Sequence, residues 1–429
     1  MLSPRTEPSH LRCLAAAFLV IAAGGADARE LWTSGDGEKS VSLKTSLKSS
    51  FLLSHAPDDA SLFPERDIAA TLGRLRLTLD ARPRAWMNAE AAYEHRARSV
   101  SEGAGSGTGA GLLSAQVDAP YRISQVDEPI VEVGDTFSYR HELDRALVAL
   151  HFEGCELMVG RQAIGLGRGT IFSAVDVFAP FSPAEVDREW RRGVDAVKVD
   201  VPIADTYSFG VVAAFGEDWD RSAVLARLRG YAGDFDAELI VGKRAEDDMY
   251  GAVVSAGIGG AEFHCELAVF RTPEEWEDAG LFGDDKWVGK GVFGGSYNFD
   301  VGAGLTAVAE YHYCGFGVGD IRDAATKLEE EEYQSRYLRG DMQMLSQHAL
   351  ALKASYTFAD TWGTSMTWMQ SLTDGSGFLA PSLTWDFAEN VTVILSTSLP
   401  YGATPSGGTL RSEYGAMPTS VFIQMSLYY

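Results

Sequence analysis

Apolar and polar residues alternate along almost the whole chain after about residue 40, with the period of two that is typical of β-strands. The clearest example is the C-terminal segment 421–429, VFIQMSLYY. Apolar residues occupy every second position there, while Gln424 and Ser426 lie on the opposite face. Segments of about ten residues with one apolar and one polar face are typical of membrane β-barrels.

The same pattern predicts about 18 strands, within a range of 16 to 18, because even strand numbers are usual in bacterial barrels. The predicted strands are approximately 41–54, 67–81, 85–98, 139–153, 155–164, 193–201, 207–217, 224–232, 235–243, 248–258, 261–273, 286–299, 304–316, 346–358, 362–372, 377–387, 391–401 and 419–429.

Long and short connections between these strands mostly alternate along the chain. The links 99–138, 165–192, 274–285, 317–345 and 402–418 are long, whereas most of the intervening links have only a few residues. This alternation is expected when one rim of an up-and-down meander faces outside and the other faces the periplasm. We therefore predict an all-β fold, a transmembrane antiparallel β-barrel, in which 165–192 is the third outer loop.

The N-terminus has the features of a secretory signal. Arg5 and Arg12 provide a basic region, 14–23 is a short apolar core, and Ala26-Asp27-Ala28 fits a cleavage site. We predict a signal peptide over 1–28 and one barrel domain over 29–429. No apolar run after residue 28 reaches the roughly 20 residues that a membrane helix needs.

The composition of the chain excludes several kinds of partner and site. The chain has 36 Lys and Arg against 60 Asp and Glu, a formal net charge of −24, which makes nucleic acid an unsuitable partner. Beyond the signal there are three cysteines, Cys155, Cys265 and Cys314, so at least one lacks an intrachain disulfide partner. No cysteine and histidine spacing fits a metal or haem site, and we predict no cofactor.

The 165–192 link combines glycines, aromatic residues, two prolines and both signs of charge. A link of this length in a compact fold is expected to have a function. We predict that it folds into the barrel and narrows the pore, with its charges orienting polar solutes and filtering ions. An alternative, compatible interpretation is that these charges pair with each other and with the wall to fix the loop. The predicted constriction residues are Arg168, Asp176, Glu185, Asp187, Arg188, Glu189, Arg191 and Arg192.

Charged residues on the polar faces of the strands are predicted to line the lumen. Neighbouring strands often carry opposite signs, which suggests cross-strand ion pairs. The acids Glu262, Glu266 and Glu310 have fewer basic neighbours, so we hypothesise a net acidic wall that favours cations. Arg161 is an exception, since its position in the alternation places it on the apolar face. The predicted lumen-wall residues are Arg74, Arg76, Arg145, Lys198, Arg227, Arg229, Glu262, Glu266 and Glu310.

One short motif carries a family resemblance. Its residues are Gly160-Arg161-Gln162, Gly165, Gly167, Asp176-Val177-Phe178, Pro180, Pro183, Asp187 and Gly193-Val194-Asp195-Ala196. The motif resembles a pattern in poorly characterised porin-like outer-membrane β-barrel proteins of Gram-negative bacteria. The terminal strand ending in Tyr429 is similar to the signal by which the barrel-assembly machinery recognises such proteins. The resemblance implies an outer-membrane pore with an inward-folded third outer loop, and it specifies no solute.

The main hypothesis is an outer-membrane channel for passive or weakly selective diffusion of small hydrophilic solutes or ions, in contact with outer-membrane lipid. One alternative is a barrel that sheathes a periplasmic or redox partner, which would favour a wider lumen. Another is a barrel-embedded lipid-modifying enzyme, which would need a Ser, a His and an acid together on the outer face. We predict that the protein is not an enzyme, and the sequence leaves homo-oligomerisation open.

Overall fold

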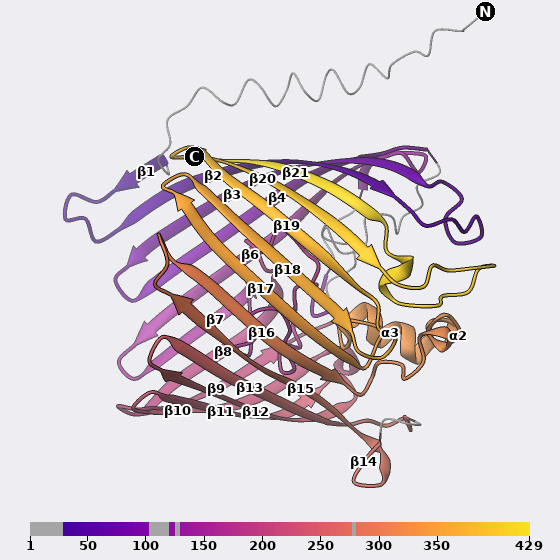
Figure 1. Cartoon of the computed structure of the whole chain (residues 1–429). Helices are drawn as coiled ribbons and strands as arrows, with labels where there is room; N and C mark the ends of the chain where they lie inside the picture. The colour runs from indigo at the N-terminus through magenta and orange to yellow at the C-terminus, as the bar shows by residue number, and fades with distance from the viewer. Residues whose placement is uncertain (1–28, 103–119, 125–128, 277–279) are drawn as a thin grey trace, which may run out of the picture.

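A computed structural model describes residues 29–102, 120–124, 129–276 and 280–429. It shows a closed antiparallel barrel whose wall consists of 18 long strands (Figure 1). The predicted fold class and strand number are therefore confirmed. The predicted signal peptide, 1–28, lies outside the described residues.

The wall strands follow one another around the barrel in chain order, each paired with the next. They are β2 (Ser40–His55), β3 (Asp67–Arg84), β4 (Met87–Val100), β6 (Phe137–Phe152), β7 (Cys155–Gln162), β8 (Val194–Ala204), β9 (Tyr207–Ala214), β10 (Ala223–Ala232), β11 (Phe235–Arg244), β12 (Asp247–Ile258), β13 (Ala261–Arg271), β15 (Asp284–Phe299), β16 (Leu305–Cys314), β17 (His348–Ala359), β18 (Trp362–Ser371), β19 (Gly377–Ala388), β20 (Val391–Tyr401) and β21 (Thr419–Tyr428).

The barrel closes where the last strand pairs with the first wall strand. Residues 46–55 of β2 pair with 419–428 of β21. Thr45 and Tyr429 then exchange two backbone hydrogen bonds of 2.7 Å. Three short strands that the alternation did not predict extend the wall: β1 (Arg29–Thr33) on β2, β5 (Pro129–Val133) on β6 and β14 (Gly280–Leu281) on β15.

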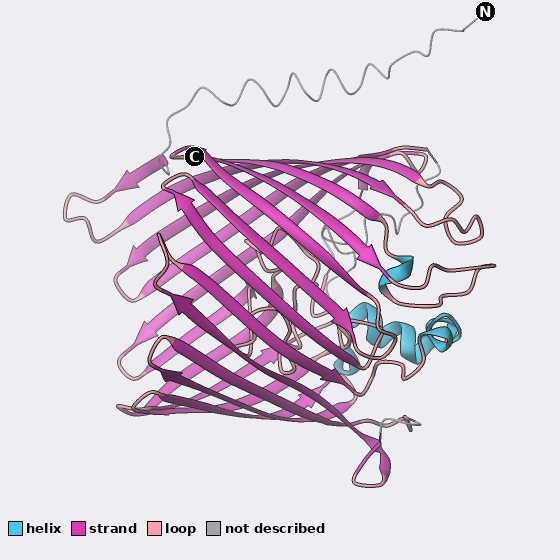
Figure 2. Ribbon diagram, viewed as in Figure 1, coloured by secondary structure: helices cyan, strands magenta, loops and turns pink. Residues whose placement is uncertain are grey.

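The two rims differ as predicted. Short turns and the C-terminus lie at one rim, while long connections and helices lie at the other (Figures 1 and 2). The helices among the described residues are α2 (Ala324–Glu329) and α3 (Glu331–Arg339), with short 3-10 turns at Trp219–Arg221, Ile321–Asp323 and Tyr414–Ala416. No described helix has the length and apolarity needed to cross a membrane.

The outer face carries an apolar band between two levels of aromatic residues. Leu239, Val254 and Leu267 are 60%, 45% and 45% exposed on this face. At the short-turn end, Trp362 and Trp385 stack with ring centroids 5.0 Å apart. At the opposite end, the ring centroids of Tyr250 and Trp287 are 6.0 Å apart. This arrangement matches the lipid-facing band and interfacial aromatic residues of membrane barrels.

A bulge changes the alternation in β6. The register with β4 shifts between Ala92, opposite Arg145, and Tyr93, opposite Leu143, so Asp144 is the extra residue. Asp144 and Arg145 are consequently both buried, at 2% and 7% exposure. Strict alternation would have placed one of them on the outer face.

Arg161 is not exposed on the apolar face, despite its position in the alternation. It is 6% exposed, lies opposite Asp195 of β8 and forms a 2.7 Å ion pair with it. Its guanidinium also donates to the carbonyls of Leu143 and Ser124, both at 2.8 Å. An ion pair and the covering segment 120–124 therefore satisfy this charge.

Candidate functional site

The 165–192 loop, between β7 and β8, runs inside the barrel, where Figure 2 shows it between the front and back walls. Its side chains and backbone contact β2, β3, β6, β11, β13, β16 and β21. These strands lie on different sides of the barrel, so the loop crosses the lumen.

Two buried glutamates of the wall bind the backbone of the loop. Glu310 of β16 accepts hydrogen bonds from the N–H groups of residues 170, 171 and 172, at 2.6, 2.9 and 2.9 Å. Glu266 of β13 accepts from the N–H groups of 168, 169, 174 and 175 and from the hydroxyl of Ser173. The two carboxylates are 1% and 0% exposed. Hydrogen bonds from several N–H groups to one carboxylate are charge-assisted and strong, so these glutamates fix the loop.

Two glycines allow the loop to approach Glu266 so closely. Gly167 has φ +89°, a conformation that favours glycine. A Cβ atom there would lie 2.4 Å from Glu266 Oε1, and one at Gly169 would lie 1.9 Å from the carbonyl oxygen of Phe172. Gly167 therefore allows a sharp turn that brings the loop backbone against Glu266.

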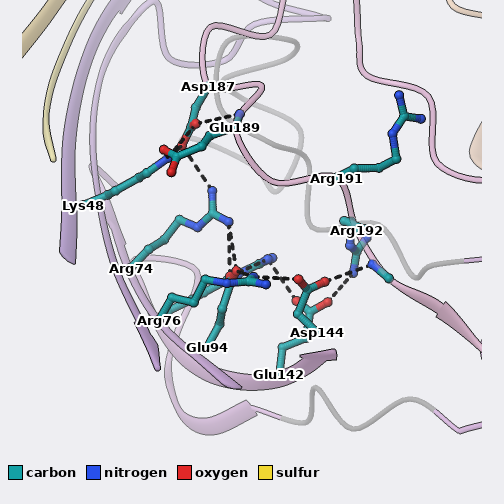
Figure 3. Close-up of polar contacts among 12 residues, drawn as sticks. Lys48, Arg74, Arg76, Glu94, Glu142, Asp144, Asp187, Glu189, Arg191 and Arg192 are labelled. Atoms are coloured by element: carbon teal, nitrogen blue, oxygen red, sulfur yellow. Dashed lines mark hydrogen bonds and ion pairs between the residues drawn. The ribbon is translucent and has the colours of Figure 1, made fainter. Parts of the chain in front are cut away.

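The far end of the loop is held by charges on the opposite wall (Figure 3). Lys48 of β2 pairs with Asp187 and Glu189, both at 2.7 Å, and is itself 1% exposed. Arg74 of β3 pairs with Asp187 at 3.4 Å. The hydroxyl of Tyr428 donates to Glu189 at 2.7 Å.

Trp190 packs within the same group of cations. Its ring centre lies 3.9 Å from Lys48 Nζ and 5.3 and 5.0 Å from the guanidinium carbons of Arg74 and Arg76. Cation–π contacts of this kind are attractive, and more so when water is excluded. Trp190 therefore fixes the loop to β2 and β3 together with the ion pairs.

A second layer of ion pairs lies deeper in the same wall. Arg76 bridges Glu94 of β4 and Asp144 of β6, both at 2.6 Å. Glu142 accepts from Arg96 at 3.0 Å and is 3.4 Å from Arg192 of the loop. The same layer includes the ion pairs of Arg74 and Arg96 with Glu94, of Arg122 with Glu142 and of Arg145 with Asp144.

The rest of the loop packs against a mainly apolar part of the wall. Ile171, Phe172, Val175 and Phe178 are at most 5% exposed and belong to one core with inward residues of β8 to β16, a core that extends to a few residues of β17, β18 and β19. Phe172 stacks on His312 with ring centroids 4.7 Å apart. The loop therefore fills this side of the lumen.

The other predicted loop charges have defined partners. Arg168 pairs with Asp236 of β11, and Arg191 pairs with Asp176 and donates to the carbonyl of Ala179. Glu185 accepts from the backbone of Ser182 at 3.3 Å. Arg188 donates to four backbone carbonyls, those of residues 170, 182, 183 and 185. These contacts agree with the interpretation that the charges fix the loop.

Predicted cross-strand pairs are present only in part. Arg227 and Arg229 both bind Glu238 of β11, and Arg74 and Arg76 both bind Glu94. Arg145 instead pairs with Asp144, its neighbour in the chain, and Lys198 pairs with Asp200 at 2.7 Å. Glu262 is exposed, in contrast to Glu266 and Glu310.

Sequence reasoning missed several residues of this site. Lys48 occupies an inward position of a predicted strand, so its charge was a usable signal. Arg122 lies in a connection, and Trp190 looked like any aromatic residue of a loop. Nothing in the sequence indicated that Glu266 and Glu310 bind backbone N–H groups, because those contacts span about 100 and 140 residues.

The described part of the chain shows no group of three or more His, Cys, Asp or Glu arranged to hold a metal ion. Cys155, Cys265 and Cys314 are free thiols, and Cys314 is buried. No residue set in the described part suggests a cofactor site.

Comparisons with known proteins show the fold. No protein-family model matches the chain, and no curated protein matches its sequence significantly. Solved structures do match. The crystal structure of Acinetobacter baumannii OccAB1 has a TM-score of 0.56 at 7% identity, covering 94% of this chain and 99% of that one. Pseudomonas aeruginosa OpdL has a TM-score of 0.53 at 10% identity, with coverage of 91% and 98%. Pseudomonas aeruginosa OccK9 (OpdG) has a TM-score of 0.52 at 9% identity, with coverage of 90% and 98%. The chain thus has the fold of porin-like outer-membrane β-barrels.

Proposed function

We propose that the protein is an outer-membrane channel of a Gram-negative bacterium for the passive or weakly selective diffusion of small hydrophilic solutes. The observation that supports this most directly is a closed barrel with an apolar outer face, crossed inside by a loop that is fixed at both ends. Such a loop narrows the lumen to a size-limited passage.

The free route past the loop runs along β18 to β20, since Glu189 of the loop binds Tyr428 of β21 and Arg188 lies near Lys353 of β17. Within the described residues, the hydrogen bonds and ion pairs given above for the loop reach none of the strands β17 to β20. Four serines lie side by side on the inward face of these strands: Ser355, Ser365, Ser382 and Ser396. Hydroxyl groups donate and accept hydrogen bonds without a fixed charge, so this wall is suited to hydrated or hydroxylated solutes.

Ion selectivity through this route is weak. The cation preference hypothesised from Glu262, Glu266 and Glu310 stays a prediction, and only Glu262 among them is exposed. The other two carboxylates are occupied by the loop backbone. Their charge is therefore largely compensated by N–H dipoles before a permeating ion meets it.

The alternatives have less support. A sheath for a periplasmic or redox partner requires an open lumen, whereas the loop and its core occupy one side of this one. A lipid-modifying enzyme requires catalytic groups on the outer face, and His264 and His312 are inward and buried. We further propose that β21, with its terminal Tyr429, is the strand recognised by the barrel-assembly machinery.

Liposome swelling tests the channel function. Purified protein in liposomes should admit neutral sugars at rates that fall steeply with solute size, because the loop limits the passage. Liposomes that take up no solute faster than protein-free controls would contradict the proposal.

A further inference from the structure

Two Tyr-x-His sequences on neighbouring strands form a ring cluster on the outside of the barrel. β4 contributes Tyr93 and His95, and β6 contributes Tyr139 and His141, with the two histidines directly opposite each other in register. Side chains alternate between the faces of a strand, and Glu94, between Tyr93 and His95, belongs to the lumen network. The four rings therefore face outward.

Each tyrosine of this cluster binds the histidine of the other strand. Tyr139 Oη lies 3.0 Å from His95 Nδ1, and the hydroxyl of Tyr93 binds His141 Nδ1. Ring centroids are 6.0 Å apart for the first couple and 5.6 Å for the second. A phenol that donates its proton to Nδ1 leaves the ring proton on Nε2. Both imidazoles then present an Nε2–H donor, and no described residue accepts from either.

The cluster lies at the level of the lipid headgroups. His95 is nine residues along the wall from Trp86, which stacks on Phe152 at the short-turn end. With a rise of about 3.3 Å per residue and a strand tilt of about 40°, this is about 23 Å, close to the height of the apolar band. Tyr311 and His348 form a similar outward-facing couple at the long-loop end, where Tyr311 Oη lies 2.7 Å from His348 Nδ1.

Three residues with short side chains lie beside the rings on the outer face. Ser49, Gly73 and Ala97 lie in one row across β2, β3 and β4, and the same row continues to Tyr139 of β6. The next outward side chain of β2 after Ser49 is the larger Phe51, which is 40% exposed. A headgroup can therefore approach the two Nε2–H groups at this point.

We propose that the Tyr93, His95, Tyr139 and His141 cluster binds the phosphate of an outer-leaflet lipid. Phosphate oxygens are strong hydrogen-bond acceptors. None of the four residues of the cluster is acidic, so none of them repels a phosphate. The site goes beyond the proposed channel function and requires only that the barrel lies in a membrane.

Native mass spectrometry of the detergent-solubilised protein tests the site. The probes are lipid A with its phosphates and the same glycolipid with its phosphates removed. The wild-type protein should retain the phosphorylated lipid at least about tenfold better, a difference of about 1.4 kcal/mol. The double variant His95→Phe/His141→Phe, which keeps ring area but lacks the donors, should lose this preference.

Two further variants make the result decisive. His348→Phe removes one imidazole at the same level elsewhere and should bind like the wild type. Tyr93→Phe/Tyr139→Phe keeps both imidazoles but removes the hydroxyls that fix the ring proton on Nε2. This variant should weaken the phosphate preference in part, and it provides a test even if the histidine variant does not fold. Equal retention of both lipids by the wild type would overturn the proposal. Retention that requires added Zn²⁺ would overturn it as well, in favour of a metal site.

Discussion

At the scale of single residues, the loop depends on carboxylates that act as backbone acceptors. Replacing Glu266 with alanine leaves four N–H groups and one hydroxyl without their acceptor, and each unsatisfied buried donor costs about 1–3 kcal/mol. We expect Glu266→Ala to loosen the loop and give a larger, noisier single-channel current.

Glu262→Ala is the matched control for this prediction, because Glu262 lies on the same face of β13 but is exposed. It should leave the mean current and its noise close to wild type. If both variants gave the wild-type current, Glu266 would not fix the loop.

Lys353 is the lumen residue whose replacement we expect to change ion selectivity most directly. It faces the lumen from β17, no carboxylate pairs with it within the described residues, and its charged neighbour is Arg188. Unit charges 4 Å apart in water interact by about 1 kcal/mol, which corresponds to roughly fivefold in a permeability ratio. Lys353→Gln should therefore shift the reversal potential in a KCl gradient toward cations by up to that factor.

Lys327→Gln removes the same charge from α2, outside the lumen, where Lys327 pairs with the exposed Glu330. It should leave the reversal potential unchanged. An equal shift in both variants would mean that the effect comes from net charge and not from the position of Lys353.

At the scale of elements, the strands were predictable and their irregular parts were not. Period-two alternation depends only on local sequence, so all 18 wall strands were found. The bulge at Asp144 was missed because an extra residue leaves the composition of β6 unchanged. The short strands β1, β5 and β14 have too few residues for a pattern. Helix α3 has a mostly polar sequence, and it lies in the link 317–345, which was predicted only as a long connection.

Helix α3 is attached to the barrel by buried charges. Arg336 pairs with Asp247 of β12 at 2.7 Å and with Glu274 at 3.0 Å, and it lies 3.4 Å from Asp341. Removing one partner of a buried ion pair costs about 3–5 kcal/mol, because the other charge is left uncompensated. We expect Arg336→Met to increase hydrogen exchange across 324–339 by more than a hundredfold.

The control for this helix is Arg322→Met, since the side chain of Arg322 is 69% exposed and its ion pair within the described residues is with the nearby Asp320. Hydrogen exchange in 324–339 should then match the wild type. Slow exchange retained in Arg336→Met would show that apolar contacts, and not these charges, hold α3 in place.

At the scale of the whole molecule, the barrel separates three environments. Its outer face is apolar, one side of its interior is filled by the loop and its core, and the remaining side is polar. The sequence predicted the first two features in outline, because the alternation and the long 165–192 link are both visible in it. It could not predict which side of the lumen stays open, since that depends on contacts of the loop with distant strands.

The central claim is that the 165–192 loop limits the passage through this barrel, and single-channel conductance in planar bilayers tests it most directly. Wild-type protein should give discrete conductance steps, and a variant lacking 171–188 should give clearly larger steps, because the segment between the two anchoring walls is gone. Equal conductance in the two proteins, or no discrete steps from the wild type, would contradict the account.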